Sequence, residues 1–457
     1  MELALPVISL FLLCMTGVGV WHSRRVKTSE DFVLAGRSLP THVLAGTLIA
    51  TWIGTGSLFG NAEFAFTHGI AGFLLPISGL VGMLILAYLA PKVRALSAQG
   101  IPDIVGIPFG NAARRIAAVA LIVAYLVIVS YQYRAGAAVA QRIVPGIPAA
   151  FLPVFFALFV ILYTALAGMV SVAWTDVMNG AVMSIGLLAA LVIVYLGWDS
   201  AAQPLPASHL NLGGGLGMIG WVNVMLPSFL LLLGDANLYQ RFLSAESPEA
   251  ARKSAYWTFF GLLVLESAII AIAILAKARL PVAPANPGHA IIEVAFSLVP
   301  PVVGLLLAAT AVAVIVSTAD SYLLACTTTF SSGFGQKNVT PAKQRAAVAI
   351  FGAVALWISF WSDKFLSVAL YAYTLYGASL TPAVLCALLR PKTKPRAVVG
   401  GMAAGLTVAL LWKGASAMGL VPAALSSWDP VLPALAANLG VLILVEKLSS
   451  DARPSVD

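Results

Sequence analysis

Long apolar runs dominate this chain and constrain its fold more than any other feature. A helix needs about 20 mostly apolar residues to cross the roughly 30 Å hydrocarbon core of a bilayer. Thirteen runs are long enough: 3–21, 43–66, 70–90, 115–140, 149–168, 175–197, 218–238, 255–278, 300–330, 343–361, 365–389, 397–419 and 430–447. Charged residues make up only 10% of the chain, too few to cover a soluble protein of this size. The sequence therefore predicts an all-α polytopic membrane protein with about 13 transmembrane helices.

The basic residues set the expected orientation. The first run is preceded by Glu2 and followed by Arg24 and Lys27, which predicts a retained helix with its N-terminus outside rather than a cleaved signal peptide. In that orientation most of the 26 Lys and Arg residues fall on the cytoplasmic side, in agreement with the positive-inside rule. We expect a multi-pass protein of the cell membrane with a cytoplasmic C-terminus. The Ala-rich composition and the lack of sorting signals favour a bacterial inner membrane.

Several function classes are disfavoured. The net charge of +8 comes from small basic groups between apolar runs, so nucleic acid is not an expected partner. No GxxxxGK[ST], GxSxG or HExxH motif occurs, which argues against ATP-driven transport and against an enzyme. The three cysteines lie inside apolar runs without metal-ligand spacing, so no disulfide or zinc site is expected. The expected surroundings are the lipid bilayer, and no obligatory protein partner is evident.

Two of the apolar runs are interrupted. The second run contains Gly54 and Gly56 near its middle, and the seventh contains Gly234 followed by Asp235. The two runs are five apart, so they hold matching positions if the second to sixth and the seventh to eleventh runs form an inverted repeat. Paired interrupted spans of this kind point to the binding site of a transporter. The alternative is that the glycines only allow close helix packing.

The ninth run carries hydroxyl groups on one helical face. Val314, Ser317, Thr318 and Ser321 are spaced i, i+3, i+4 and i+7, which places them on the same side of a helix. Facing the freed carbonyls of a broken helix, such hydroxyls would form an all-oxygen cage suited to a hard alkali cation. The alternative is that they bond back to carbonyls of the preceding turn, as Ser and Thr often do in membrane helices.

Several ionisable residues lie within or beside apolar runs. Asp176 and Asp320 are notable because an acid at the centre of a membrane helix costs about 2.5–3.5 kcal/mol on insertion scales, although Asp176 is expected near the cytoplasmic end of its span. Glu266 in the eighth run has no evident partner. Arg241, which follows the seventh run, is expected to anchor its cytoplasmic end.

At these residues the chain resembles the sodium:solute symporter family over essentially its whole length. The motifs occur in the family's order: DFVLAGRSLP before the second run, ATWIG within it, YTALAGMVSVAWTDVMNG across the fifth and sixth, LYQRFLSAESPEAARKS after the seventh and STADSYLL in the ninth. The resemblance implies a LeuT-like fold of five plus five helices in an inverted repeat. It implies one transporter domain over 1–457: an extra N-terminal helix and loop (1–40), a first repeat (41–200), a second repeat (215–390) and two C-terminal helices (395–447).

The resemblance also implies ion sites. The sodium site common to the family would use five residues, through the backbone carbonyls of the first three and the hydroxyls of the last two: Ala50, Ile53, Val314, Ser317 and Thr318. Some members hold a second cation, at positions that correspond here to Asp176, Ser317, Asp320 and Ser321. Since those members can carry a hydroxyl where this chain has Asp320, the two acids would either bind a cation tightly or share a proton. We predict one sodium ion and leave the second site open.

The solute is less constrained. The second run looks most like the choline-transporter branch of the family, and Trp52 would face the central cavity, where an aromatic face attracts a quaternary ammonium. Thr55, Gly56 and Asp235 are the other candidate solute contacts, with Asp235 balancing a positive charge. However, the choline branch has an aromatic residue at the position of Asp235, and Trp52 is equally explained as a packing residue. Choline-like cations, amino acids, sugars and carboxylates remain open.

The function predicted from these features is sodium-coupled secondary active transport, in which a small organic solute is imported by alternating access. The main alternative is a proton-coupled symporter that uses Asp176 and Asp320. A channel or solute sensor on the same fold, or an intramembrane enzyme, is a further alternative.

Overall fold

The computed structural model describes residues 4–24, 26–144, 146–197, 203–335, 340–361 and 365–448. Within these ranges the structure is helical and contains no β-strand. The helices are α1 (Ala4–Ser23), α2 (Ser29–Leu34), α3 (Thr41–Trp52), α4 (Ala62–His68), α5 (Leu74–Arg94), α6 (Ile101–Ile143), α7 (Leu152–Leu196), α8 (Met218–Gly234), α9 (Ala236–Ser244), α10 (Pro248–Arg279), α11 (Ala290–Ser297), α12 (Pro301–Gly333), α13 (Pro341–Ser359), α14 (Phe365–Leu389), α15 (Pro395–Ala417) and α16 (Val431–Leu448). The all-α class predicted from the sequence is confirmed.

Ten helices in the described part of the chain are long and apolar enough to cross a membrane. α7 bends at Gly168, where φ is +68°. The stretch before the bend, Leu152–Leu166, is too short to count as a span, so the fifth predicted run is not among the ten. The exact number of spans, the domain boundaries and the orientation stay predictions, and the outermost residues of the predicted domain, 1–3 and 449–457, lie outside the described ranges.

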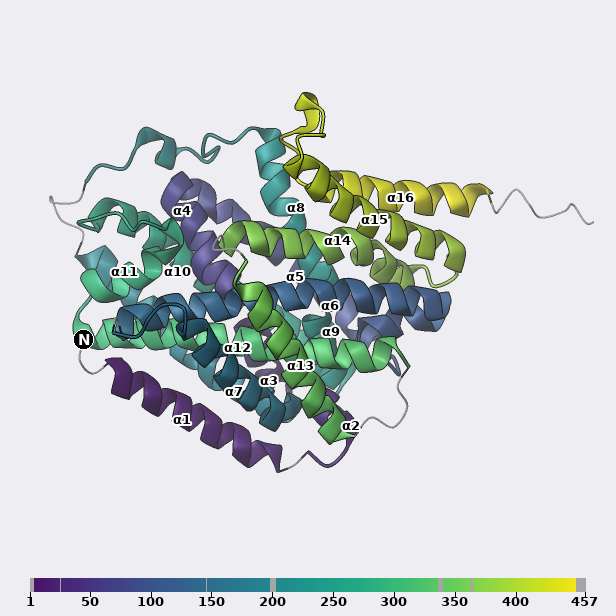
Figure 1. The fold of residues 1–457 in the computed structure, drawn as a ribbon, viewed down its shortest axis with the longest axis horizontal. Coiled ribbons are helices and arrows are strands. Elements are labelled where there is room, and N and C mark those ends of the chain that lie inside the picture. The colour runs from purple at the N-terminus through teal and green to yellow at the C-terminus, as the bar shows by residue number, and fades with distance from the viewer. Residues whose placement is uncertain are drawn as a thin grey trace, which may run out of the picture.

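The helices form a bundle around α12. In α12, 78% of the most apolar window is buried inside the protein, whereas the value is 17% in α1 and in α16. α1 packs beside α7 at one side of the bundle, and α15 and α16 pack together beside α14 at the opposite side (Figure 1). The outer helices carry many exposed apolar side chains, such as Leu13, Trp21 and Leu444, as lipid-facing helices do.

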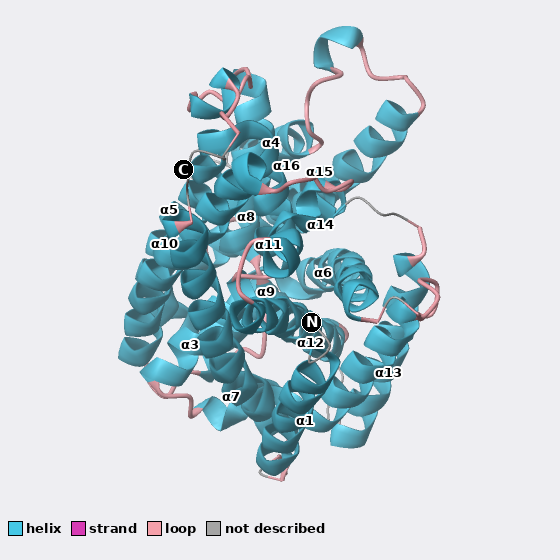
Figure 2. Ribbon diagram, turned by 90° about the vertical axis from the view of Figure 1, so that its left-hand side faces the viewer, coloured by secondary structure: helices cyan, strands magenta, loops and turns pink. Residues whose placement is uncertain are grey.

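Two helices are interrupted at the places predicted from glycine. α3 ends at Trp52, and a π-helical segment, Gly56–Asn61, leads into α4. α8 ends at Gly234, and Asp235 is extended, with φ −76° and ψ 111°, before α9 begins. A β-carbon on Gly234 would clash with the Thr381 hydroxyl of α14, so close packing also requires this glycine. Both breaks lie within the bundle, where protein groups can bond to the freed backbone (Figure 2).

Candidate functional site

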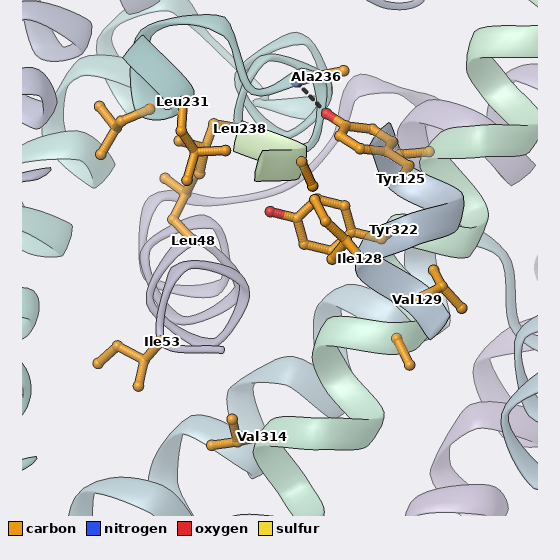
Figure 3. Close-up of a cluster of buried hydrophobic side chains, with 14 of the residues drawn as sticks. Leu48, Ile53, Tyr125, Ile128, Val129, Leu231, Ala236, Leu238, Val314 and Tyr322 are labelled. Atoms are coloured by element: carbon orange, nitrogen blue, oxygen red, sulfur yellow. Dashed lines mark hydrogen bonds between the residues drawn. The ribbon is translucent and has the colours of Figure 1, made fainter. Parts of the chain in front are cut away.

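The break after α3 frees backbone oxygens beside α12. Ile53 leaves helical geometry, with φ −74° and ψ 80°. The N–H of Gly54 donates to the carbonyl of Trp52 at 2.8 Å, so the Ala50 carbonyl loses the bond that a continuous helix would provide. Figure 3 shows Ile53 at this end of α3 and Val314 on α12 nearby. The structure therefore brings together the two segments whose carbonyls were predicted to bind sodium.

Ser317 lies between the Ala50 carbonyl and the carboxylate of Asp176. Its hydroxyl oxygen is 2.5 Å from Asp176 Oδ1 and 3.4 Å from the Ala50 carbonyl oxygen. Because a hydroxyl has a single proton, the shorter contact takes it. The lone pairs of Ser317 are then free on the side of the Ala50 carbonyl, which is the orientation that a cation ligand needs.

Thr318 is the other predicted hydroxyl ligand. Its side chain is buried, and Oγ1 has no hydrogen-bond partner among the described residues. A buried polar atom without a hydrogen-bond partner lowers the stability of the folded protein. A sodium ion bound to this oxygen would offset that cost. The residue packs against the break in α3, since a β-carbon on Gly54 would lie 2.9 Å from Thr318 Oγ1.

We expect Gly54→Ala to weaken sodium binding by about tenfold, or about 1.4 kcal/mol, because its methyl group would displace the Thr318 side chain. Gly17→Ala is the matched control, since a β-carbon on Gly17 meets no atom within 4 Å. Sodium titrations of the thermal unfolding midpoint would compare the two variants. Equal sodium affinities in both would show that Thr318 is not positioned as a ligand.

Behind Ser317, a fully buried ion pair joins α7 and α9. Arg241 Nη2 lies 2.9 Å from Asp176 Oδ2, and the two side chains are 1% and 0% exposed. Arg241 also donates to Thr47 Oγ1 at 2.8 Å and to Ser321 Oγ at 2.8 Å. The expectation that Arg241 anchors a cytoplasmic helix end was therefore wrong: the buried carboxylate of Asp176 draws the guanidinium into the bundle.

This pair bears on the predicted second cation site. The guanidinium already contacts Asp176 and Ser321, two of the residues predicted there. Asp320 is also fully buried; Oδ1 accepts from Ser321 at 3.3 Å, and Oδ2 has no partner within the described ranges. The region thus holds two carboxylates and one guanidinium.

A central cavity lies between the two broken helices. Its lining comes from α3, the π-helical segment, α5, α6, α8, α10, α12 and α14. Two predicted solute contacts, Trp52 and Gly56, line it, and so does Thr318. The Trp52 ring also packs on α5, where a β-carbon at Gly79 would lie 2.9 Å from it. The position of Trp52 is therefore compatible with a solute contact and with a packing role.

The other two predicted solute contacts are engaged elsewhere. Thr55 donates its hydroxyl proton to Gln132 Oε1. Asp235 accepts hydrogen bonds from Tyr125 at 2.8 Å and Tyr322 at 2.9 Å, and it caps α9 through the N–H of Asn237 at 2.8 Å. Figure 3 shows Tyr125 reaching the first turn of α9, where its hydroxyl also accepts from the Ala236 N–H at 2.7 Å. Neither residue is part of the cavity lining.

Glu266, for which the sequence showed no partner, lines the cavity, although sequence reasoning did not place it among the solute contacts. Glu266 of α10 is 1% exposed and accepts from Ser57 Oγ at 2.6 Å and Asn61 Nδ2 at 3.0 Å. An acid in an apolar run signals a hidden partner. The partners themselves lie more than two hundred positions away along the chain, so the sequence did not reveal them.

The sequence profile of the sodium:solute symporter family matches residues 32–405. The chain belongs to the sodium:solute symporter family. A sodium/proline symporter of Staphylococcus aureus is 24% identical over 442 residues, covering 89% of this chain and 85% of the relative. Membership confirms a multi-pass membrane protein that works as a sodium-coupled symporter and is not an enzyme.

Solved structures confirm the LeuT-like fold. A Na+-coupled sialic acid symporter, in a substrate-bound outward-open state, superposes with a TM-score of 0.82 at 17% identity, covering 98% of this chain and 97% of that one. A nucleobase-cation-symport-1 family transporter in a closed conformation, with bromovinylhydantoin bound, gives a TM-score of 0.64 at 15% identity over 93% and 95% of the two chains. The relative and the two structural neighbours differ in the solutes that they are named for, so the solute must be inferred from the residues of this chain.

Proposed function

We propose that this symporter imports one small organic solute together with one sodium ion bound where α3 meets α12. The ligands would be the carbonyls of Ala50, Ile53 and Val314 with the hydroxyls of Ser317 and Thr318. The membrane would be a bacterial inner membrane, with the N-terminus outside and the C-terminus in the cytoplasm.

The surroundings of the Thr318 side chain are the main support for this proposal. Its hydroxyl is buried and has no hydrogen-bond partner in the described part of the chain, and the same residue lines the central cavity. An ion bound to Thr318 would therefore border the solute. Sodium can shift the conformational equilibrium only if it binds one state more tightly than the other, and a ligand shared with the cavity provides such a difference. One charge crossing 100 mV supplies about 2.3 kcal/mol.

Arg241 supports a stoichiometry of one sodium. Its guanidinium contacts Asp176 and Ser321 and would supply the positive charge that a second cation brings in some relatives. We expect no second sodium while this ion pair is formed.

Proton coupling is the second candidate. It is favoured by Asp320 Oδ2, which has no hydrogen-bond partner among the residues that the structure describes. In that case Asp320 would carry a proton through the cycle while Asp176 stays paired with Arg241. Asp320→Asn would then abolish any stabilisation that depends on pH and leave the response to sodium unchanged.

The test is the thermal unfolding midpoint of the purified protein in sodium and in potassium buffer. A ligand at one hundred times its Kd stabilises the folded state by about 2.7 kcal/mol. We expect Thr318→Ala to raise the sodium concentration for half-maximal stabilisation by about tenfold or more. Thr327→Ala on the same helix is the control, because its hydroxyl donates to the Leu323 carbonyl at 3.2 Å, which is a local bond within the helix. The proposed site fails if both variants respond to sodium like the unaltered protein.

A further inference from the structure

Glu266 places a carboxylate in the wall of the central cavity. Among the described residues that line this cavity, it is the sole carboxylate, and none of them is Lys, Arg or His. Glu63, an acid of α4 just after the π-helical segment, is not part of the lining. The cavity wall therefore carries a single fixed negative charge if Glu266 is ionised.

The hydrogen bonds to Glu266 leave it incompletely satisfied. Ser57 donates to Oε1 and Asn61 donates to Oε2, one donor for each oxygen. An ionised carboxylate offers about four acceptor positions, and no basic side chain of the described residues forms an ion pair with Glu266. Burying a carboxylate without a cation is costly. A positively charged group in the cavity would remove that cost.

The two side chains that donate to Glu266 lie on a π-helical segment, where the helix is wider than an α-helix. Ser57 and Asn61 are four residues apart on the π-helical segment Gly56–Asn61, and such segments occur frequently at functional sites. They orient the carboxylate toward a cavity that is also lined by Trp52, Tyr131 and Tyr373. Aromatic rings attract cations through their faces, so the ring contacts and the carboxylate favour the same kind of solute.

We propose that Glu266 is the anionic anchor of the solute site and that the transported solute carries an ammonium group. This proposal rests on the sodium symport proposed above and narrows its solute class. The ammonium would lie against the Glu266 carboxylate and the aromatic rings, either as a quaternary cation or as the amino group of a zwitterion. Solutes that carry only a negative charge would be repelled, and uncharged sugars would leave Glu266 without a counter-charge.

The test uses the purified full chain and its thermal unfolding midpoint in sodium buffer. The probes are choline, glycine betaine and L-proline as ammonium compounds, with glucose and acetate as neutral and anionic comparisons. We expect at least one ammonium probe to stabilise the protein, and glucose and acetate to have no effect. Choline and betaine separate a free cation from a zwitterion, and L-proline reports an amino acid.

Glu266→Gln is expected to weaken binding of the stabilising probe by about thirtyfold or more, as loss of one partner of a buried charge pair does. Glu63→Gln is the matched control and should bind like the unaltered protein. Equal weakening in both variants, stabilisation by acetate or glucose alone, or no response to any ammonium probe would overturn the proposal. If Glu266→Gln does not fold, the proposal is judged on the unaltered protein alone: ammonium probes must stabilise it, and glucose and acetate must not.

Failure of this proposal can be told apart from failure of sodium symport. The shift caused by sodium without solute is measured in the same experiment and does not involve Glu266. A retained sodium shift without ammonium selectivity would reject only the role of Glu266. Loss of the sodium shift in the unaltered protein would reject the ion site instead.

Discussion

Arg241→Ala is expected to lower the free energy of unfolding by about 3–5 kcal/mol, because it leaves the buried carboxylate of Asp176 without its counter-charge. The guanidinium also donates to Thr47 and Ser321, so three elements lose a common partner. Arg252→Ala, at an exposed position of α10, is the control and should have little effect. The measurement is the unfolding midpoint in mild detergent.

A double-mutant cycle separates the ion pair from general packing. Asp176→Asn alone should also destabilise the protein, since it leaves Arg241 buried without an anion. The double variant should be less destabilised than the sum of the two single variants, as expected for residues in direct contact. Additive effects would contradict a direct contact between these two side chains.

Asp235→Ala is expected to lower the free energy of unfolding by about 3 kcal/mol or more. It removes the cap of α9, worth about 1 kcal/mol, and leaves the buried hydroxyls of Tyr125 and Tyr322 without an acceptor, at about 1–3 kcal/mol for each group. The loss should appear in the absence of any solute. Tyr125→Phe is the milder comparison, because it keeps the ring and the Asp235 carboxylate and removes only the hydroxyl that links Asp235 and the Ala236 N–H.

This prediction also decides between two roles for Asp235. If the residue stabilises the break between α8 and α9, the variants lose stability and those that fold still respond to solute. A variant of normal stability that has lost only its response to solute would show that Asp235 contacts the solute, as the sequence had suggested.

The sequence was sufficient for the features that depend on local pattern. Long apolar runs predicted a helical bundle, and glycine in the second and seventh runs predicted the two breaks. The i, i+3, i+4 spacing placed Val314, Ser317 and Thr318 on one face, and that face meets the end of α3 in the structure. Each of these inferences depends on residues that are close along the chain.

The features that depend on distant pairing were not predictable in the same way. A buried charge requires a partner, but its own sequence neighbourhood does not say which residue that is. Arg241 pairs with Asp176 sixty-five positions away, and Glu266 accepts from Ser57 two hundred and nine positions away. Asp235 was assigned to the solute as the residue that would balance a positive charge, whereas two tyrosines from other helices donate hydrogen bonds to it.

The most direct measurement of the central claim is binding of radiolabelled sodium to the purified protein at equilibrium. We expect saturable binding of one ion per chain, which potassium does not displace. Ser317→Ala combined with Thr318→Ala should abolish this binding, while Thr327→Ala should retain it. Sodium binding of unchanged affinity in the double variant would contradict the site between α3 and α12, and two ions per chain would contradict the role given to Arg241.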